Sequence, residues 1–108
     1  MSLESLLKEK LDPEDKLQKS YTARYEGKHG FLVMSKKKLL FAEEKGFMRK
    51  TYNVLLEIPY TKVRESTVEK NQLVFEASGK KYGITPEEVS PTTIQKSFKE
   101  LAKSASSK

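Results

Sequence analysis

The sequence has no cysteine and a single histidine, His29. The lack of cysteine excludes disulfides, thiolate zinc sites and cysteine nucleophiles. With one histidine, a zinc or di-iron site would have to be built almost wholly from carboxylates. The sequence also lacks a phosphate-binding P-loop, a nucleophile elbow and a dinucleotide fingerprint. We therefore predict a protein that is not an enzyme and has no catalytic residues, bound metal or cofactor.

Long apolar runs are also missing. No apolar segment approaches the roughly 18–20 residues that a membrane-spanning helix needs. The first ten residues, MSLESLLKEK, lack the positive start and apolar centre of a signal peptide. Together with the absence of cysteine, these features predict a cytoplasmic protein and leave peripheral attachment to a membrane open.

Negative charge is the scarcer sign, with 15 acidic residues against 21 lysines and arginines and a formal net charge of +6. Such a balance favours anionic partners, either nucleic acid or a lipid surface, but does not choose between them. Small lysine-rich proteins are often basic without any such partner. The chain of 108 residues fits a single domain.

Residues 1–16 are predicted to form a short amphipathic helix. Ser2 is a suitable N-cap, and Pro13 ends the helical pattern. One apolar stripe runs along this helix and consists of Leu3, Leu6, Leu7 and Leu11. The stripe can pack on its own domain or present the helix to a second copy of the chain. Packing on its own domain is the favoured interpretation.

Seven short apolar or alternating segments follow, with turn residues between them. They are residues 20–26, 31–34, 39–42, 49–58, 63–69, 72–77 and 81–85. Alternation in the first segment places Tyr21, Ala23 and Tyr25 on one buried face. Pro59 ends the fourth segment, because proline cannot donate a hydrogen bond to a neighbouring strand. The pattern predicts seven strands joined mostly by tight turns.

Two helix caps are predicted after the last strand. Thr85, Pro86 and Glu88 have the layout of a capping box, and Ser90 repeats the cap before a longer helix. The apolar face of that helix consists of Ile94, Phe98, Leu101 and Ala102. Residues 104–108 are expected to form a frayed tail.

The order of seven antiparallel strands and one amphipathic helix resembles a pleckstrin-homology-like fold. Residues 30–41, GFLVMSKKKLLF, are similar to the G-x-Φ-x-Φ-[ST]-x-x-[RK]-Φ-x-F hairpin (Φ, apolar) of GRAM domains and small prokaryotic pleckstrin-homology-like proteins. Residues 58–63, IPYTKV, resemble the I-P-Y-x-x-I step from the fourth to the fifth strand. The resemblance covers about residues 17–103. It implies a mainly β (α+β) barrel or sandwich of two roughly orthogonal sheets, plugged at one end by the C-terminal helix.

The same resemblance implies a binding or recruitment module. Relatives that bind phosphoinositides use basic residues from the loops after the first, third and sixth strands, which cluster at the open end. In this chain those loops contain Arg24, Lys28, His29, Lys45, Arg49, Lys50, Lys80 and Lys81. The expected partner is an anionic lipid surface or an acidic protein segment. The family's basic-x-basic pattern entering the second strand is replaced by apolar residues 31–33, which favours weak attraction over stereospecific headgroup recognition.

Phe47 and Met48 lie between a glycine and two cations in the loop KGFMRK. They either dip into a membrane or begin the fourth strand and point into the core, and the core position is the favoured interpretation. The strand edge beside the C-terminal helix is a further candidate peptide groove.

The densest basic run, SKKK at residues 35–38, is predicted to be a solvated turn closed by the Ser35 hydroxyl. Two alternative functions stay open: non-specific nucleic-acid binding, and a scaffold that forms homo-oligomers through the N-terminal helix. The aromatic residues at alternating strand positions argue against nucleic acid, because they are expected in the core and not on a stacking surface.

Overall fold

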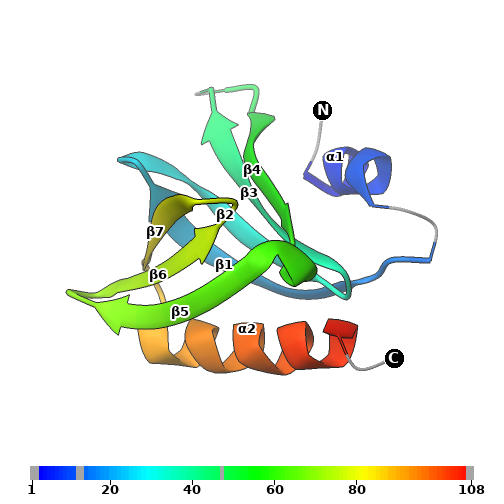
Figure 1. Cartoon of the computed structure of the whole chain (residues 1–108). Coiled ribbons are helices and arrows are strands. Elements are labelled where there is room, and N and C mark those ends of the chain that lie inside the picture. The colour runs from blue at the N-terminus through cyan, green and yellow to red at the C-terminus, as the bar shows by residue number, and fades with distance from the viewer. Residues whose placement is uncertain (1–2, 12–13, 47, 107–108) are drawn as a thin grey trace.

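Two helices and seven strands form in the part of the chain that the computed structural model describes, residues 3–11, 14–46 and 48–106 (Figure 1). In chain order the elements are α1 (Leu3–Lys10), β1 (Leu17–Tyr25), β2 (Lys28–Ser35), β3 (Lys38–Lys45), β4 (Thr51–Pro59), the 3-10 turn η1 (Tyr60–Lys62), β5 (Val63–Glu69), β6 (Gln72–Ala77), β7 (Lys80–Pro86) and α2 (Pro91–Ser106).

The strands belong to one antiparallel sheet in the order β4-β3-β2-β1-β7-β6-β5. β1 pairs with β2 from Leu17 to Tyr25 but with β7 only from Ala23 to Tyr25. The two halves of the sheet, β1–β4 and β5–β7, are therefore joined only along the end of β1 and diverge beyond it. β4 and β5 are the two edges of the sheet, so it curves without closing. The predicted mainly β fold of seven antiparallel strands with a C-terminal helix is confirmed. The expected barrel or sandwich of two roughly orthogonal sheets is corrected in one respect, because the strands form one sheet that curves without closing into a barrel.

Several strands are longer than the sequence predicted. The first turn consists of Glu26 and Gly27, both with positive φ, so Lys28 and His29 already belong to β2. Near the same end of β1, Thr85 and Pro86 pair with Arg24 and Ala23, and the Glu87 N–H donates to the Thr22 carbonyl at 3.0 Å. The capping box predicted at this point is therefore wrong, because pairing with β1 holds these residues in an extended conformation.

The main core lies between the concave face of the sheet and α2, which packs against η1, β2, β5, β6 and β7. Ile94 and Phe98 of α2 are buried, and the Phe98 ring contacts the rings of Tyr60 and Phe75. The predicted cap is confirmed, since the Thr93 N–H donates to the Ser90 hydroxyl at 3.3 Å. The helix extends to Ser106, three residues beyond the expected boundary at 103, and residues 107–108 lie outside the described chain.

α1 covers the opposite face of the sheet, beside β3 and β4 (Figure 1). Leu6 and Leu7 are buried, and Leu7 packs with Val33 and Leu40. The Lys38 ammonium donates to the Lys10 carbonyl at 2.6 Å and so caps the end of the helix. Packing of this helix on its own domain is confirmed. The helix ends at Lys10, before Pro13, where the sequence predicted the helical pattern to end, and the side chain of Leu3 lies outside the described part.

Gly30, the first residue of the hairpin formed by β2 and β3 over residues 30–41, is required because the two strands approach closely there. A Cβ atom at Gly30 would lie 2.1 Å from the Ala42 carbonyl oxygen of β3. At Gly83 the nearest atom to an added Cβ is the flexible Gln72 side chain, at 3.1 Å.

We predict that Gly30→Ala lowers the free energy of unfolding by about 1–3 kcal/mol, because β2 must move away from β3. The matched Gly83→Ala variant should lose less than about 1 kcal/mol. Urea unfolding followed by circular dichroism measures both. Equal losses in the two variants would contradict the steric requirement at Gly30.

Candidate functional site

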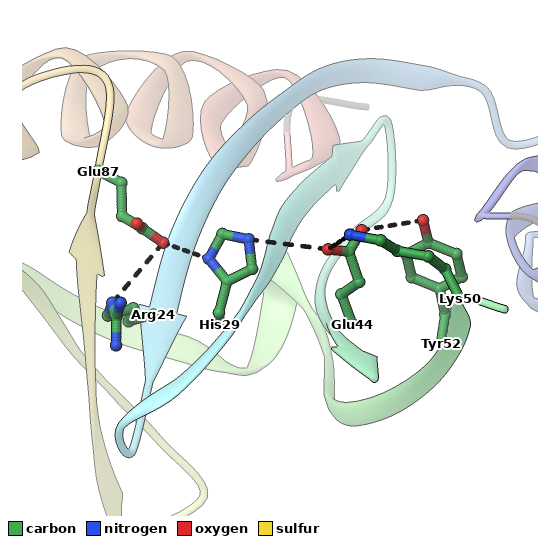
Figure 2. Close-up of polar contacts among 6 residues, drawn as sticks. All are labelled: Arg24, His29, Glu44, Lys50, Tyr52 and Glu87. Carbon is green, nitrogen blue, oxygen red and sulfur yellow. Dashed lines mark hydrogen bonds and ion pairs between the residues drawn. The ribbon is translucent and has the colours of Figure 1, made fainter. Parts of the chain in front are cut away.

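Three of the predicted basic residues belong to a row of ion pairs across the outer face of the sheet (Figure 2). Arg24 of β1 is paired in register with His29 of β2. The Glu87 carboxylate lies 3.8 Å from Arg24 Nε and 2.5 Å from His29 Nδ1. On the other side of the ring, His29 Nε2 lies 4.0 Å from Glu44 Oε1. Glu87 and Glu44 thus flank the histidine.

Glu44 extends this row to the start of β4. Its Oε1 accepts a hydrogen bond from Lys50 Nζ at 2.9 Å, and its Oε2 accepts one from the Tyr52 hydroxyl at 3.0 Å (Figure 2). The Lys50 hydrogen bond lowers the pKa of Glu44 despite the opposing effect of burial, and the same bond raises the pKa of Lys50. Burial and the bond to Glu44 raise the pKa of Tyr52. The basic side chains of this row therefore already have carboxylate partners, and an anion would have to compete with Glu44 and Glu87 for them.

The other predicted cations divide into two groups. Lys45 Nζ lies 3.7 Å from Glu43, and Lys80 Nζ lies 5.2 Å from the centre of the Tyr82 ring. Within the described chain, the remaining three are exposed and make no ion pair: Lys28, Arg49 and Lys81. The predicted cluster is thus a mixture of neutralised and available charges.

The loop between β3 and β4 presents an apolar side chain to solvent. Met48 is 91% exposed, and Arg49 and Lys50 follow it directly. The ladder between β3 and β4 ends at the pairing of Lys45 with Thr51, so Met48 lies outside β4. The favoured interpretation of Met48 as a core residue is therefore wrong. Phe47, for which the same was expected, lies outside the described residues.

The SKKK segment forms the predicted turn, in which Lys36 and Lys37 are exposed, whereas Ser35 is buried and Lys38 is half-buried. The Ser35 hydroxyl accepts a hydrogen bond from Lys38 N–H at 3.1 Å and donates one to Asp15 Oδ2 at 2.8 Å. Asp15 is buried, and its Oδ1 accepts from the Lys37 N–H at 3.2 Å. The Tyr60 hydroxyl donates to the Ser35 carbonyl at 2.7 Å. Burial raises the pKa of Tyr60, and the nearby Asp15 charge raises it further.

A groove lies beside this turn, at the C-terminal end of α2, and no sequence motif indicated it. Its volume is about 630 Å³. Its walls come from four segments of the chain, namely Glu14 and Gln18, Lys36 and Lys37, Pro59 and Thr61, and Leu101 and Ser104. The linear signal was weak because these residues are ordinary turn and helix residues, far apart in sequence.

The described residues contain no group of three or more histidine, aspartate or glutamate side chains placed to hold a metal ion. None of the helices, as far as the chain is described, is long and apolar enough to cross a membrane. The arrangement supplies charged and apolar contact surfaces, with no assembled set of metal ligands among residues 3–11, 14–46 and 48–106.

The Glu44 carboxylate gives a pH-dependent prediction. Because its pKa is lowered in the folded protein, its stabilising contribution is present above the ordinary value of 4.5 and is lost as the pH falls below it. Glu44→Gln should therefore unfold at lower urea concentration than the unmodified protein at pH 7, with the difference shrinking toward pH 3. The control is Glu69→Gln, at an exposed carboxylate that makes no ion pair within the described chain. An E44Q deficit that stays constant with pH would contradict this role of the charge.

Comparison with known proteins supports the architecture. No family model matches the sequence, and no curated protein matches it. Among solved structures, the chain is similar to a pleckstrin homology domain from Shewanella amazonensis SB2B, with a TM-score of 0.56 and 20% sequence identity. The match covers 93% of this chain and 95% of that one. At this identity the likeness concerns the fold alone, and the chain accordingly has a pleckstrin-homology-like fold.

Proposed function

We propose that this protein is a non-enzymatic recruitment module that attaches weakly to an anionic membrane surface through the loop between β3 and β4. The observation that carries the proposal is the exposure of Met48, which is 91% accessible in the loop that follows Lys45 of β3 and also contains Arg49 and Lys50. An exposed apolar side chain surrounded by cations suits the boundary between lipid headgroups and acyl chains.

The expected affinity is low. A lysine or arginine near an anionic bilayer contributes about 1 kcal/mol, and full burial of a methionine side chain about 1.5–3 kcal/mol. Arg49 and Met48 together then supply about 3 kcal/mol, which corresponds to a dissociation constant of roughly several millimolar. Such a contact localises a protein only when a second contact acts with it.

The ion-pair row argues against recognition of a particular headgroup. Arg24, His29 and Lys50 are engaged by Glu87 and Glu44, so a phosphate would have to displace carboxylates from them. The cations without a carboxylate partner in the described chain are exposed surface side chains, which respond to charge density. The proposal is therefore a salt-sensitive attraction to anionic lipid in general.

The alternative functions have less support. Tyr25, Phe41 and Phe75 are buried in the core, so these aromatic residues do not form a stacking surface for nucleic acid. Assembly through α1 loses its main argument, because Leu6 and Leu7 are buried against the same chain. An acidic protein segment at the β3–β4 loop would use the cations but leave the exposure of Met48 without a role.

Sedimentation with phosphatidylcholine vesicles of rising phosphatidylserine content tests the proposal. We expect binding that increases with anionic lipid and falls with added salt. Met48→Ser should weaken it roughly tenfold through lost apolar burial, and Arg49→Glu by a similar factor or more. The control is Val68→Ser, since Val68 is an exposed apolar residue of β5 that the proposal does not use.

Two results would contradict this function. One is the absence of salt-sensitive sedimentation at any phosphatidylserine content. The other is binding to a DNA oligonucleotide that is as strong as the vesicle binding and is lost in the same Arg49→Glu variant, which would favour the nucleic-acid alternative.

A further inference from the structure

The groove beside the SKKK turn is a second candidate site, at the other end of β3 from Met48. Figure 1 shows the turn between β2 and β3 near the C-terminal end of α2, and residues of both line the groove. The eight residues of β3 separate this turn from the β3–β4 loop by about 25 Å at roughly 3.3 Å per residue. A ligand in the groove would therefore not collide with one at the loop.

The walls of the groove are held in place by buried contacts. Asp15 fixes the turn through Ser35 and Lys37, and the Tyr60 N–H donates to the Lys37 carbonyl at 3.1 Å. The Lys36 N–H donates to the Lys16 carbonyl at 3.0 Å, which fastens the turn to the segment before β1. A turn fastened in this way presents its side chains in a fixed place and lowers the ordering cost of binding.

The charge in the groove is available, in contrast to the ion-pair row at the other end of β3. The ammonium groups of Lys36 and Lys37 are exposed, and no carboxylate of the described residues pairs with either. Glu14 is the one acidic residue in the lining. Lys16 and Lys62 are also exposed and add positive potential. Lys62 follows the lining residue Thr61 in sequence, and the Lys16 carbonyl accepts the hydrogen bond from the Lys36 N–H.

The shape and the remaining lining residues restrict the ligand class. A volume of about 630 Å³ falls within the usual range for ligand pockets, roughly 300–1,000 Å³, and is far larger than a single inorganic anion. Pro59 and Leu101 offer apolar contact, and Gln18, Thr61 and Ser104 offer hydrogen-bonding groups. A recessed groove does not match a flat bilayer, and its lining has no aromatic residue on which a base could stack.

We infer that this groove binds a short acidic segment of a partner protein. Two carboxylates of the segment contact Lys36 and Lys37, and an apolar side chain packs on Leu101 and Pro59. The site is distinct from the β3–β4 loop and does not depend on membrane attachment. The two lysines would select acidic residues of the segment, and Leu101 and Pro59 would select an apolar one.

The test uses the peptide EELEEL as probe, titrated into the ¹⁵N-labelled full chain and followed by amide chemical shifts. We expect saturable shifts confined to the groove, around Lys36, Lys37, Thr61 and Leu101. The charge-free peptide QQLQQL should bind at least tenfold more weakly, and EEQEEQ should also be weakened because it lacks the apolar side chain.

The variant Lys36→Glu/Lys37→Glu should lose at least tenfold in EELEEL affinity. The matched control is Lys80→Glu/Lys81→Glu, another adjacent pair of exposed lysines, and its affinity should stay within twofold. The spectra of both variants also report whether the fold is retained. Because Lys36 and Lys37 lie on an exposed turn, we expect the Lys36→Glu/Lys37→Glu variant to fold.

Four outcomes would overturn the inference: no shifts at millimolar peptide; shifts centred on the β3–β4 loop; equal binding of QQLQQL; or unchanged affinity in the folded Lys36→Glu/Lys37→Glu variant. Loss of vesicle sedimentation in that variant, without any peptide shifts in the unmodified protein, would instead assign these lysines to the membrane surface. Because the Met48 variants report on the loop alone, failure here and failure of the membrane proposal are distinguishable.

Discussion

The buried carboxylate of Asp15 is the contact on which much of this structure depends. It joins the segment before β1 to the turn between β2 and β3 through the Ser35 hydroxyl and the Lys37 N–H. The Tyr60 hydroxyl binds the Ser35 carbonyl and extends the same network to η1, where the Tyr60 ring packs on Phe98 of α2. A buried carboxylate is costly unless its oxygens accept hydrogen bonds, and here both of them do. Through Ser35 and Tyr60, Asp15 is thus connected to the turn between β2 and β3, to the crossing from β4 to β5, and to the C-terminal helix.

The distribution of paired and unpaired charge separates the two ends of β3. Near the β3–β4 loop, Glu44 and Glu87 engage cations that a linear reading would count as available for a ligand. At the opposite end, Lys36 and Lys37 stand at the rim of a groove with no carboxylate partner among the described residues. Net charge therefore says little about where an anion would bind. An anion gains a new contact at a lysine without a carboxylate partner, whereas at a paired cation it must replace the carboxylate.

The two proposed contacts fit together as a weak adaptor. A loop with one exposed methionine and a few cations would give only transient attachment to lipid, and a groove of modest size would give only moderate affinity for a peptide. Joined through a rigid sheet and about 25 Å apart, they would reinforce each other whenever both ligands are present at one membrane. A pleckstrin-homology-like fold can provide this arrangement because its turns emerge at both ends of a well-ordered core.

The sequence by itself determined the number of strands and their places along the chain, the buried faces of β1 and α2, and the role of Ser35 in its turn. These follow from two-residue and 3.6-residue periodicity and from local hydrogen bonding, which depend on near neighbours in the chain. Only the tertiary structure decided that the sheet stays open, that β7 continues through Pro86, that Met48 is exposed, and that Arg24 and His29 share Glu87. That last contact joins His29 to a residue 58 positions away, so it depends on strand register and packing. The groove has the same origin, since its walls come from four segments that meet only after folding.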